Sequence, residues 1–206
     1  MATTIIVTRH GHVEGIDPPR FRGREDVPLT SLGVKQAKAT AKRIAALWEP
    51  TIVYTSPMTR CVTTGAAIAE ACHAPAQIMP YLNDLDYGAW QWKTHQEVAQ
   101  HFPDDYATWF HAPHLFRLPE GESLQDLVAR AAEALRRVLQ QHRDQTAVLV
   151  GHDSVDRALL TQVLDQPLSA YWRLHLEPCG ISEIQVEGLE PRVLRLNETF
   201  HLVDIA

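Results

Sequence analysis

The stretch Thr3-Thr4-Ile5-Ile6-Val7-Thr8-Arg9-His10-Gly11-His12 decides the fold class. Its first six residues are all β-branched and form an unbroken run, which predicts a fully buried strand over Thr3–Thr8. An arginine and two histidines follow at once, so cationic and titratable side chains lie where this strand ends. The segment from Gly11 to Pro28 is rich in Gly, Pro and Arg and is expected to be a loop.

The remainder of the chain alternates strands and helices. Buried strands are expected over Thr51–Thr55 and Thr146–Val150, and a closing hairpin over Ile181–Glu187 and Pro191–Asn197. Helices are expected from a cap at Thr30 or Ser31 to about Trp48, from Ser56-Pro57 to about Cys72, from a capping box at Ser123 to about Gln141, and over Ser154–Leu164. Residues 76–121 are irregular, with short helices over Thr94–His101 and Asp104–Phe110. Because strands joined by helices pair in parallel, we predict an α/β fold over residues 1–206 as a single domain: a three-layer αβα arrangement with a mostly parallel central sheet and helices on both faces.

Charge and composition exclude several classes of partner. The chain has 206 residues and 19 Lys plus Arg against 25 Asp plus Glu, so no global positive field favours nucleic acid. The three cysteines are odd in number and widely spaced, which predicts neither a disulfide framework nor a zinc site and fits a reducing cytoplasm. No apolar run approaches the roughly 20 residues that cross a bilayer, and no signal peptide is recognisable, so we expect a soluble cytoplasmic protein with no membrane partner.

Basic side chains follow each of the three buried strands. Arg9, His10 and His12 follow the first, Arg60 lies one turn into the helix after the second, and His152 follows the third. Ligands of parallel sheets bind beyond the carboxyl ends of the strands, so we expect these side chains to meet. Guanidinium and imidazole groups together suit a dianionic tetrahedral group, and the sequence therefore predicts a phosphate site.

The same residue types can also support catalysis. A neutral imidazole can attack phosphorus, which divides one difficult displacement into phosphorylation and hydrolysis of a histidine. The leaving alkoxide then needs a proton from a carboxylic acid held partly out of water.

Six blocks in a set order resemble the histidine phosphatase superfamily, which has the phosphoglycerate-mutase-like fold. The blocks are Arg9-His10-Gly11; Leu29-Thr30 with Gly33 and Gln36-Ala37; Thr55-Ser56-Pro57 with Arg60 and Thr63-Thr64; Leu82-x-Asp84 with Gly88 and Trp90; Gly121-Glu122-Ser123; and Gly151-His152. They extend from about residue 5 to residue 165. Arg-His-Gly alone is a weak signal, whereas six ordered blocks are a specific one.

The resemblance implies a role for each matching residue. His10 would be the nucleophile that becomes phosphohistidine, and Arg9, Arg60 and His152 would hold the phosphoryl oxygens. Asp84 falls where the family usually has a glutamate proton donor, with Asp86 as a weaker candidate. Neither a metal nor another cofactor is implied.

The first loop departs from the family pattern. His12, Val13 and Gly15 stand where the usual side-chain donors to phosphate are expected. The loop instead carries Arg20, Arg22 and Arg24, and the interpretation is that one or more of them replaces the lost contacts or binds a second anionic group on the substrate. Surface ion pairing is the alternative for at least one of them, and a hydrogen bond within the loop is the alternative to phosphate contact for His12.

The preferred function is a phosphomonoesterase that hydrolyses a small phosphorylated metabolite through phosphohistidine. A phosphoglycerate-mutase-type phosphoryl transfer is the nearest alternative, although mutases of this family tend to be longer. A metal-dependent barrel hydrolase is disfavoured because eight β/α units need about 250 residues, and a non-catalytic phosphate-binding module is the remaining alternative. The C-terminal hairpin has an apolar edge that leaves a homodimer open.

Overall fold

The computed structural model describes residues 2–188 and 190–205, whose strands form one six-stranded sheet of order β3-β2-β4-β1-β5-β6. The strands are β1 (Thr3–Arg9), β2 (Pro50–Thr55), β3 (Ala76–Ile78), β4 (Thr146–Gly151), β5 (Ile181–Glu187) and β6 (Glu190–Glu198). Strands β3, β2, β4 and β1 are neighbours in this order and are parallel. Strand β5 pairs antiparallel with β1, and β6 pairs antiparallel with β5. The expectation of a mostly parallel sheet closed by a hairpin is confirmed.

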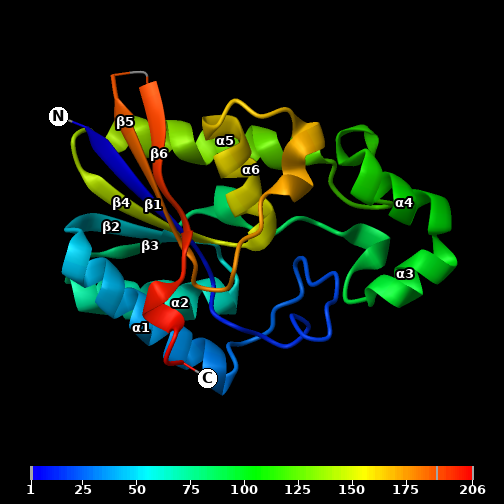
Figure 1. The fold of residues 1–206 in the computed structure, drawn as a ribbon, viewed down its shortest axis with the longest axis horizontal. Coiled ribbons are helices and arrows are strands. Elements are labelled where there is room, and N and C mark those ends of the chain that lie inside the picture. The colour runs from blue at the N-terminus through cyan, green and yellow to red at the C-terminus, as the bar shows by residue number, and fades with distance from the viewer. Residues whose placement is uncertain (1, 189, 206) are drawn as a thin grey trace.

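Helices cover both faces of this sheet (Figure 1). The α-helices of the described residues are α1 (Ser31–Leu47), α2 (Thr59–Cys72), α3 (His95–His101), α4 (Pro103–His111), α5 (Leu124–Gln141) and α6 (Asp153–Val163). Helices α1 and α2 pack on the face that carries Ile6, Val53 and Val148, and α5 and α6 on the face that carries Val7 and Leu149. The predicted three-layer αβα arrangement is therefore confirmed.

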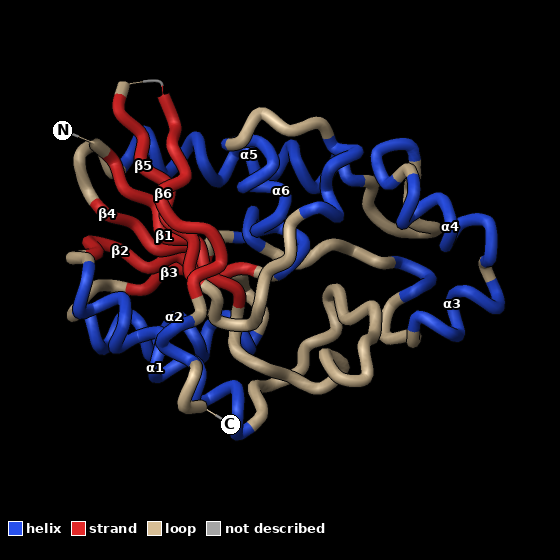
Figure 2. Tube along the Cα trace, in the orientation of Figure 1, coloured by secondary structure: helices blue, strands red, loops and turns tan. Residues whose placement is uncertain are grey.

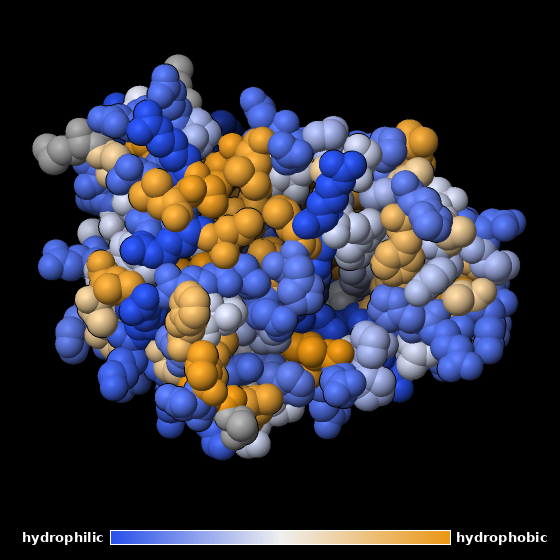
Figure 3. All heavy atoms as spheres, viewed as in Figure 1, coloured by the Kyte–Doolittle hydropathy of each residue, from blue (hydrophilic) through white to orange (hydrophobic). Residues whose placement is uncertain are grey.

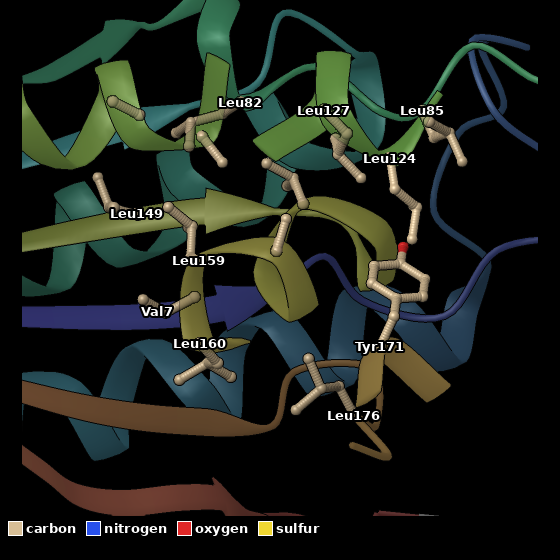
Figure 4. Packing of buried hydrophobic residues seen from close by; sticks show 14 of the residues in the cluster. Val7, Leu82, Leu85, Leu124, Leu127, Leu149, Leu159, Leu160, Tyr171 and Leu176 are labelled. Carbon is tan, nitrogen blue, oxygen red and sulfur yellow. The ribbon is translucent and has the colours of Figure 1, made fainter. Parts of the chain in front are cut away.

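Alternation along β1 explains the layers. Successive side chains of a strand point to opposite faces, so Ile5 and Val7 enter one core and Ile6 the other, and all three are almost fully buried. A strand covered on both sides needs apolar residues at every position, which is why the run is unbroken. Figure 4 shows the larger core, in which side chains from α5, α6 and the segment after α6 gather against the strands; those labelled include Leu124, Leu127, Leu159, Leu160, Tyr171 and Leu176.

Capping residues set the helix starts that the sequence indicates. Thr30 caps α1 by accepting a hydrogen bond from the Gly33 N–H, and Ser123 forms a capping box with Asp126 at the start of α5.

The helix start predicted at Ser56-Pro57 is wrong. Helix α2 begins at Thr59, and its N-cap Met58 has no side-chain cap; the Ser56 hydroxyl contacts His152 instead.

The irregular segment between α2 and α5 contains one strand that the sequence does not predict. β3 has three exposed residues at the edge of the sheet, beside β2, so it carries no buried apolar run that would predict it. Beyond it, α3 and α4 extend to one side of the sheet (Figure 2), and the buried Trp90 and Trp109 pack into the main core. No helix in residues 2–188 and 190–205 is both long and apolar enough to cross a membrane.

Candidate functional site

The ends of β1 and β4 bring two histidines together. Arg9 and Gly151 are register partners in this parallel pair, so the residues that follow them, His10 and His152, leave the sheet at the same level. Their ring centroids are 5.2 Å apart with an edge-to-face angle of 65°. Both rings are almost completely buried. Residues more than 140 positions apart in the sequence therefore share one site, as the strand order requires.

The His10 ring is held in one tautomer. Its Nδ1 lies 2.7 Å from the Gly11 carbonyl oxygen. Because a carbonyl can only accept, Nδ1 carries the proton and Nε2 keeps its lone pair. Burial, and then the nearby positive charges of Arg60, lower the pKa of His10 well below 6.5. The ring is thus a neutral imidazole with an unprotonated Nε2 near neutral pH.

His152 is neutral for the same physical reasons. The Arg60 Nε–H donates to its Nδ1 (3.2 Å), so Nε2 carries the proton and donates to the Ser56 hydroxyl (2.8 Å). Burial and the charge of Arg60 lower the pKa of His152 well below 6.5. These two hydrogen bonds fix the orientation of the ring beside His10.

Arg60 links the three segments of the site. Its side chain is fully buried, and its guanidinium donates to the carbonyl oxygens of Glu25 (2.7 Å) and Gly23 (2.6 Å) in the first loop. The same group forms an ion pair with Asp84 at 3.0 Å. One side chain therefore holds the first loop and Asp84 in place around His152.

Asp84 accepts hydrogen bonds from donors on α2, on α6 and in its own turn. Its Oδ1 accepts from the Ser154 hydroxyl (2.5 Å) and the Leu85 N–H (2.8 Å), and its Oδ2 accepts from Arg60 and lies 3.4 Å from His152 Nδ1. The neighbouring Asp86 points elsewhere: it pairs with Arg24 at 3.0 Å and accepts from the Gly88 N–H.

A half-buried arginine on α5 holds the backbone that carries Asp84. Arg130 donates to the carbonyl oxygens of Tyr81 (3.1 Å), Asn83 (2.5 Å) and Asp84 (2.9 Å) and pairs with Glu122 at 3.0 Å. Four charge-assisted contacts from one rigid guanidinium define the position of this turn. Because this backbone is fixed, the position of the Asp84 carboxyl group is fixed as well, although its side chain is shorter than that of a glutamate.

Arg9 is buried and Arg22 is half-buried, and neither forms an ion pair with a carboxylate within residues 2–188 and 190–205. Arg9 donates to the Leu176 carbonyl oxygen (2.8 Å) and Arg22 to that of Gly15 (2.5 Å), while both Nε–H groups are buried without an acceptor. Burial and the charge of Arg9 lower the pKa of Arg22 to about 10. A guanidinium with a buried, unsatisfied N–H is costly, so two of them on one cavity wall indicate a place built for an anion.

His12, Arg24 and Arg20 each have a hydrogen-bond or ion-pair partner of their own. His12 contacts the Thr30 hydroxyl through its Nδ1 (2.9 Å) and is half-buried. Arg24 forms ion pairs with Asp86 and Glu122 (3.0 and 3.1 Å), as the surface-pairing alternative expects. Arg20 donates to the Trp92 carbonyl oxygen (2.8 Å) and lies over the Trp92 ring.

A cavity of about 240 Å³ opens beside these groups. Its wall contains Arg9 and Arg22, whose charges act on His10, whereas the buried His10 ring is not itself part of the wall. Figure 3 shows the molecule hollowed between the sheet-bearing body and the α3–α4 segment, with hydrophilic side chains in the recess. Within residues 2–188 and 190–205, no three or more His, Cys, Asp or Glu side chains group in a way that could hold a metal ion.

Sequence reasoning missed the residues that support this constellation. Ser56 is predicted as a helix start and belongs to one of the six blocks, but the sequence predicts no role for it in the site, and nothing in the pattern marks Ser154 or Arg130. A glycine is required at position 11 by close packing. A Cβ there would lie 2.4 Å from the Gly33 carbonyl oxygen, so Gly11 allows α1 to approach the turn after His10. The signals for these partners are tertiary contacts, which local spacing does not encode.

Comparison with known proteins agrees with the geometry. The model of the histidine phosphatase superfamily (branch 1) matches residues 5–199. Phosphoserine phosphatase 1 of Hydrogenobacter thermophilus is 31% identical over 198 residues, covering 96% of this chain and 93% of that protein. A metal-independent phosphoserine phosphatase of Arabidopsis thaliana is 30% identical over 163 residues, covering 78% and 68%.

Among solved structures, YhfR of Bacillus stearothermophilus superposes with a TM-score of 0.92 at 29% identity, covering 97% of this chain and 99% of that one. This likeness confirms the predicted phosphoglycerate-mutase-like fold. The matched residues include both strand ends that carry His10 and His152. The chain therefore belongs to the histidine phosphatase superfamily, branch 1.

Proposed function

We propose that the protein is a phosphatase that hydrolyses a small phosphorylated metabolite through a phosphohistidine on His10. The observation that carries the proposal is a neutral imidazole with its Nε2 lone pair available, surrounded by the positive charges of Arg9, Arg22 and Arg60. These arginines repel the His10 imidazole only when the ring is protonated, and they attract a phosphate dianion.

In the proposed complex, the phosphate meets the guanidinium groups that lack an anion. Arg9 and Arg22 line the cavity and have buried Nε–H groups free to donate. Their movement onto the phosphoryl oxygens would open the path to His10. Arg22 would thereby replace the loop donors that the family pattern expects near residues 12–16, and Arg60 and His152 would contact the remaining oxygens.

Phosphoryl transfer then proceeds in two balanced steps. In the reactive complex we propose Asp84 as a protonated carboxylic acid: His10 Nε2 forms a bond to phosphorus while the ester P–O bond breaks, and Asp84 gives its proton to the leaving alkoxide and becomes a carboxylate. A water molecule next attacks phosphorus, the N–P bond breaks, and Asp84 takes back a proton from that water. Asp84 is preferred over Asp86 because it is the carboxyl group beside His152 and Arg60. This covalent route needs no metal and no other cofactor.

We propose phosphoserine and similarly small phosphate esters as substrates. The support is the names of the two phosphoserine phosphatases reported above and the limited cavity of about 240 Å³. All three cysteines are free thiols, which supports a reducing cytoplasm as the place of action. The whole chain is proposed to act as a single catalytic domain.

A homodimer is proposed through the edge strand β6. Leu194 and Leu196 are about half exposed on this strand, at the end of the sheet order. An uncovered edge with apolar side chains favours pairing with a second copy.

A screen of phosphate release over small phosphomonoesters, with His10→Ala as the blank, tests the proposed activity. We expect release of inorganic phosphate by the wild-type protein and none above the blank in the variant. Incubation with 3-phosphoglycerate and a bisphosphoglycerate primer tests the mutase alternative: formation of the isomer without net phosphate release would contradict hydrolysis. Absence of release from every ester at high protein concentration would contradict catalysis altogether.

A further inference from the structure

The cavity beside His10 extends past the groups assigned to the phosphate. Its wall also contains Arg20 from the first loop, Asp153 and Arg157 from α6, and aromatic side chains that include Tyr87 and Trp172. In Figure 1 the first loop lies on one side of the sheet end, and α6 with the segment that follows it lies on the other. The alcohol part of a bound ester would therefore meet two different surfaces.

The charge near the phosphate is already balanced without these groups. Arg9 and Arg22, which form no ion pair with a carboxylate in the part of the chain that the structure describes, together supply the two positive charges that match a phosphate dianion. Asp153 and its ion pair are thus not needed to bind phosphate. The charges of Asp153 and Arg157 therefore lie on the side of the cavity where the alcohol part of the ester would bind.

Arg157 is held too firmly to serve as a ligand. It is buried, donates to the Leu174 carbonyl oxygen, and lies over the rings of Trp172 (5.0 Å) and Tyr171 (5.8 Å). Its Nη2 contacts Asp153 Oδ1 at 2.9 Å. The pair therefore fixes the carboxylate of Asp153 by one oxygen, and Oδ2 is not part of the pair.

Asp153 is the more exposed partner of this pair. Its side chain is 26% exposed and lines the cavity, next to aromatic rings. A fixed carboxylate oxygen beside aromatic faces is the environment that binds an alkylammonium group, by a charge-assisted hydrogen bond and by cation–π attraction. On the loop side, Arg20 supplies a positive charge at the cavity wall, which suits a carboxylate.

We propose that Asp153 selects phosphate esters whose alcohol carries an ammonium group, and that the cavity is built for O-phosphorylated α-amino acids, with the ammonium at Asp153 and the carboxylate toward Arg20. This inference rests on the proposed phosphatase function and assigns its specificity to particular residues. The competing explanation is that the Asp153–Arg157 pair only stabilises the start of α6.

Four substrates separate these explanations: phosphoserine, with both charged groups; phosphoethanolamine, with the ammonium alone; 3-phosphoglycerate, with the carboxylate alone; and p-nitrophenyl phosphate, with neither. The variants are Asp153→Asn, which keeps the shape and the Arg157 contact, and the matched control Asp165→Asn, which changes an exposed aspartate after the end of the same helix. Thermal unfolding of both variants checks that they are folded.

We expect Asp153→Asn to lower kcat/KM about 10- to 100-fold for phosphoserine and phosphoethanolamine, mainly through KM, because one hydrogen bond to a charged group is lost. The values for 3-phosphoglycerate and p-nitrophenyl phosphate should stay within about 2-fold of wild type, and Asp153→Glu should restore part of the preference for ammonium substrates. Asp165→Asn should change none of them.

An equal fall for all four substrates would overturn the inference, since a structural role affects every substrate alike. So would a wild-type enzyme that hydrolyses p-nitrophenyl phosphate above the His10→Ala blank but does not prefer phosphoserine over 3-phosphoglycerate; the proposed function would then survive. Release from none of the four substrates would instead contradict the proposed function itself.

Discussion

At the scale of single residues, the site depends on protonation states set by burial and hydrogen bonding. His10 has a free Nε2 because a carbonyl oxygen can accept only from a protonated Nδ1. Its low pKa has burial as the largest cause and the cations Arg60, Arg9 and Arg22 among the others. The predicted loop arginines therefore differ in kind: Arg22 acts on His10, whereas Arg24 is used in surface ion pairs.

Replacing Arg22 should move the acid limb of the pH profile. With its pKa well below 6.5, His10 in the free enzyme loses activity only in acid solution, as pH falls through that pKa. Arg22→Gln removes one cause that lowers the pKa, so the limb of kcat/KM should shift toward higher pH. The comparison uses p-nitrophenyl phosphate for every variant, so that ionisation of the substrate cancels. Arg20→Gln is the control. An equal shift of the acid limb in this variant would contradict the specific effect of Arg22 on the pKa of His10.

The identity of the proton donor can be tested by the leaving group. Asp84→Asn should lower kcat about 10²- to 10⁴-fold for phosphoserine, whose alkoxide needs a proton, and much less for p-nitrophenyl phosphate, whose phenolate leaves unaided. Asp86→Asn is the matched control and should affect both substrates little. A larger leaving-group dependence in Asp86→Asn would transfer the role to that residue.

At the scale of elements, α5 shows how a core helix also positions the site. Its buried side includes Leu127, and Arg130 on the same helix holds the backbone of Asp84. Leu127→Ala should lower the free energy of unfolding by about 2–5 kcal/mol, measured by urea denaturation, because it leaves a cavity in a closed core. Leu115, which is 77% exposed, provides the control: Leu115→Ala should change stability by less than about 0.5 kcal/mol. An equal loss of unfolding free energy in the two variants would contradict the burial of Leu127 in the core.

Elements with a strong local signal were predictable from the sequence, and those fixed by tertiary contact were not. Thr30 and Ser123 mark helix starts because their side chains cap the following turn. β3 exists because its backbone pairs with β2, not because of its own residues. Ser56 resembles a cap in sequence, yet its hydroxyl is used by His152, which comes from a strand 96 residues away. The basic residues at the strand ends were found because parallel topology alone brings them together.

At the scale of the whole molecule, the two buried histidines couple stability to pH. Both have a folded-state pKa well below 6.5. As pH falls below 6.5, the unfolded chain takes up protons that the folded protein does not, so acid favours unfolding. Buried Asp156 acts in the opposite sense, because burial raises its pKa.

Comparison with His10→Gln isolates the contribution of one histidine. The free energy of unfolding of the wild type minus that of the variant should be constant above pH 6.5 and should fall as pH is lowered below it, as measured by urea unfolding at several pH values. A difference that stays constant down to acidic pH would mean that His10 titrates as an ordinary exposed histidine.

The central claim is that His10 Nε2 forms a covalent bond to phosphorus, and trapping that bond is the most direct test. Wild-type protein would be mixed with phosphoserine, quenched in alkali within the turnover time and digested. The peptide containing His10 should gain one phosphoryl group that is labile to acid, and the same peptide of His10→Ala should gain none. Turnover by the wild type without phosphorylation of that peptide, or with the phosphoryl group on another residue, would contradict the central claim.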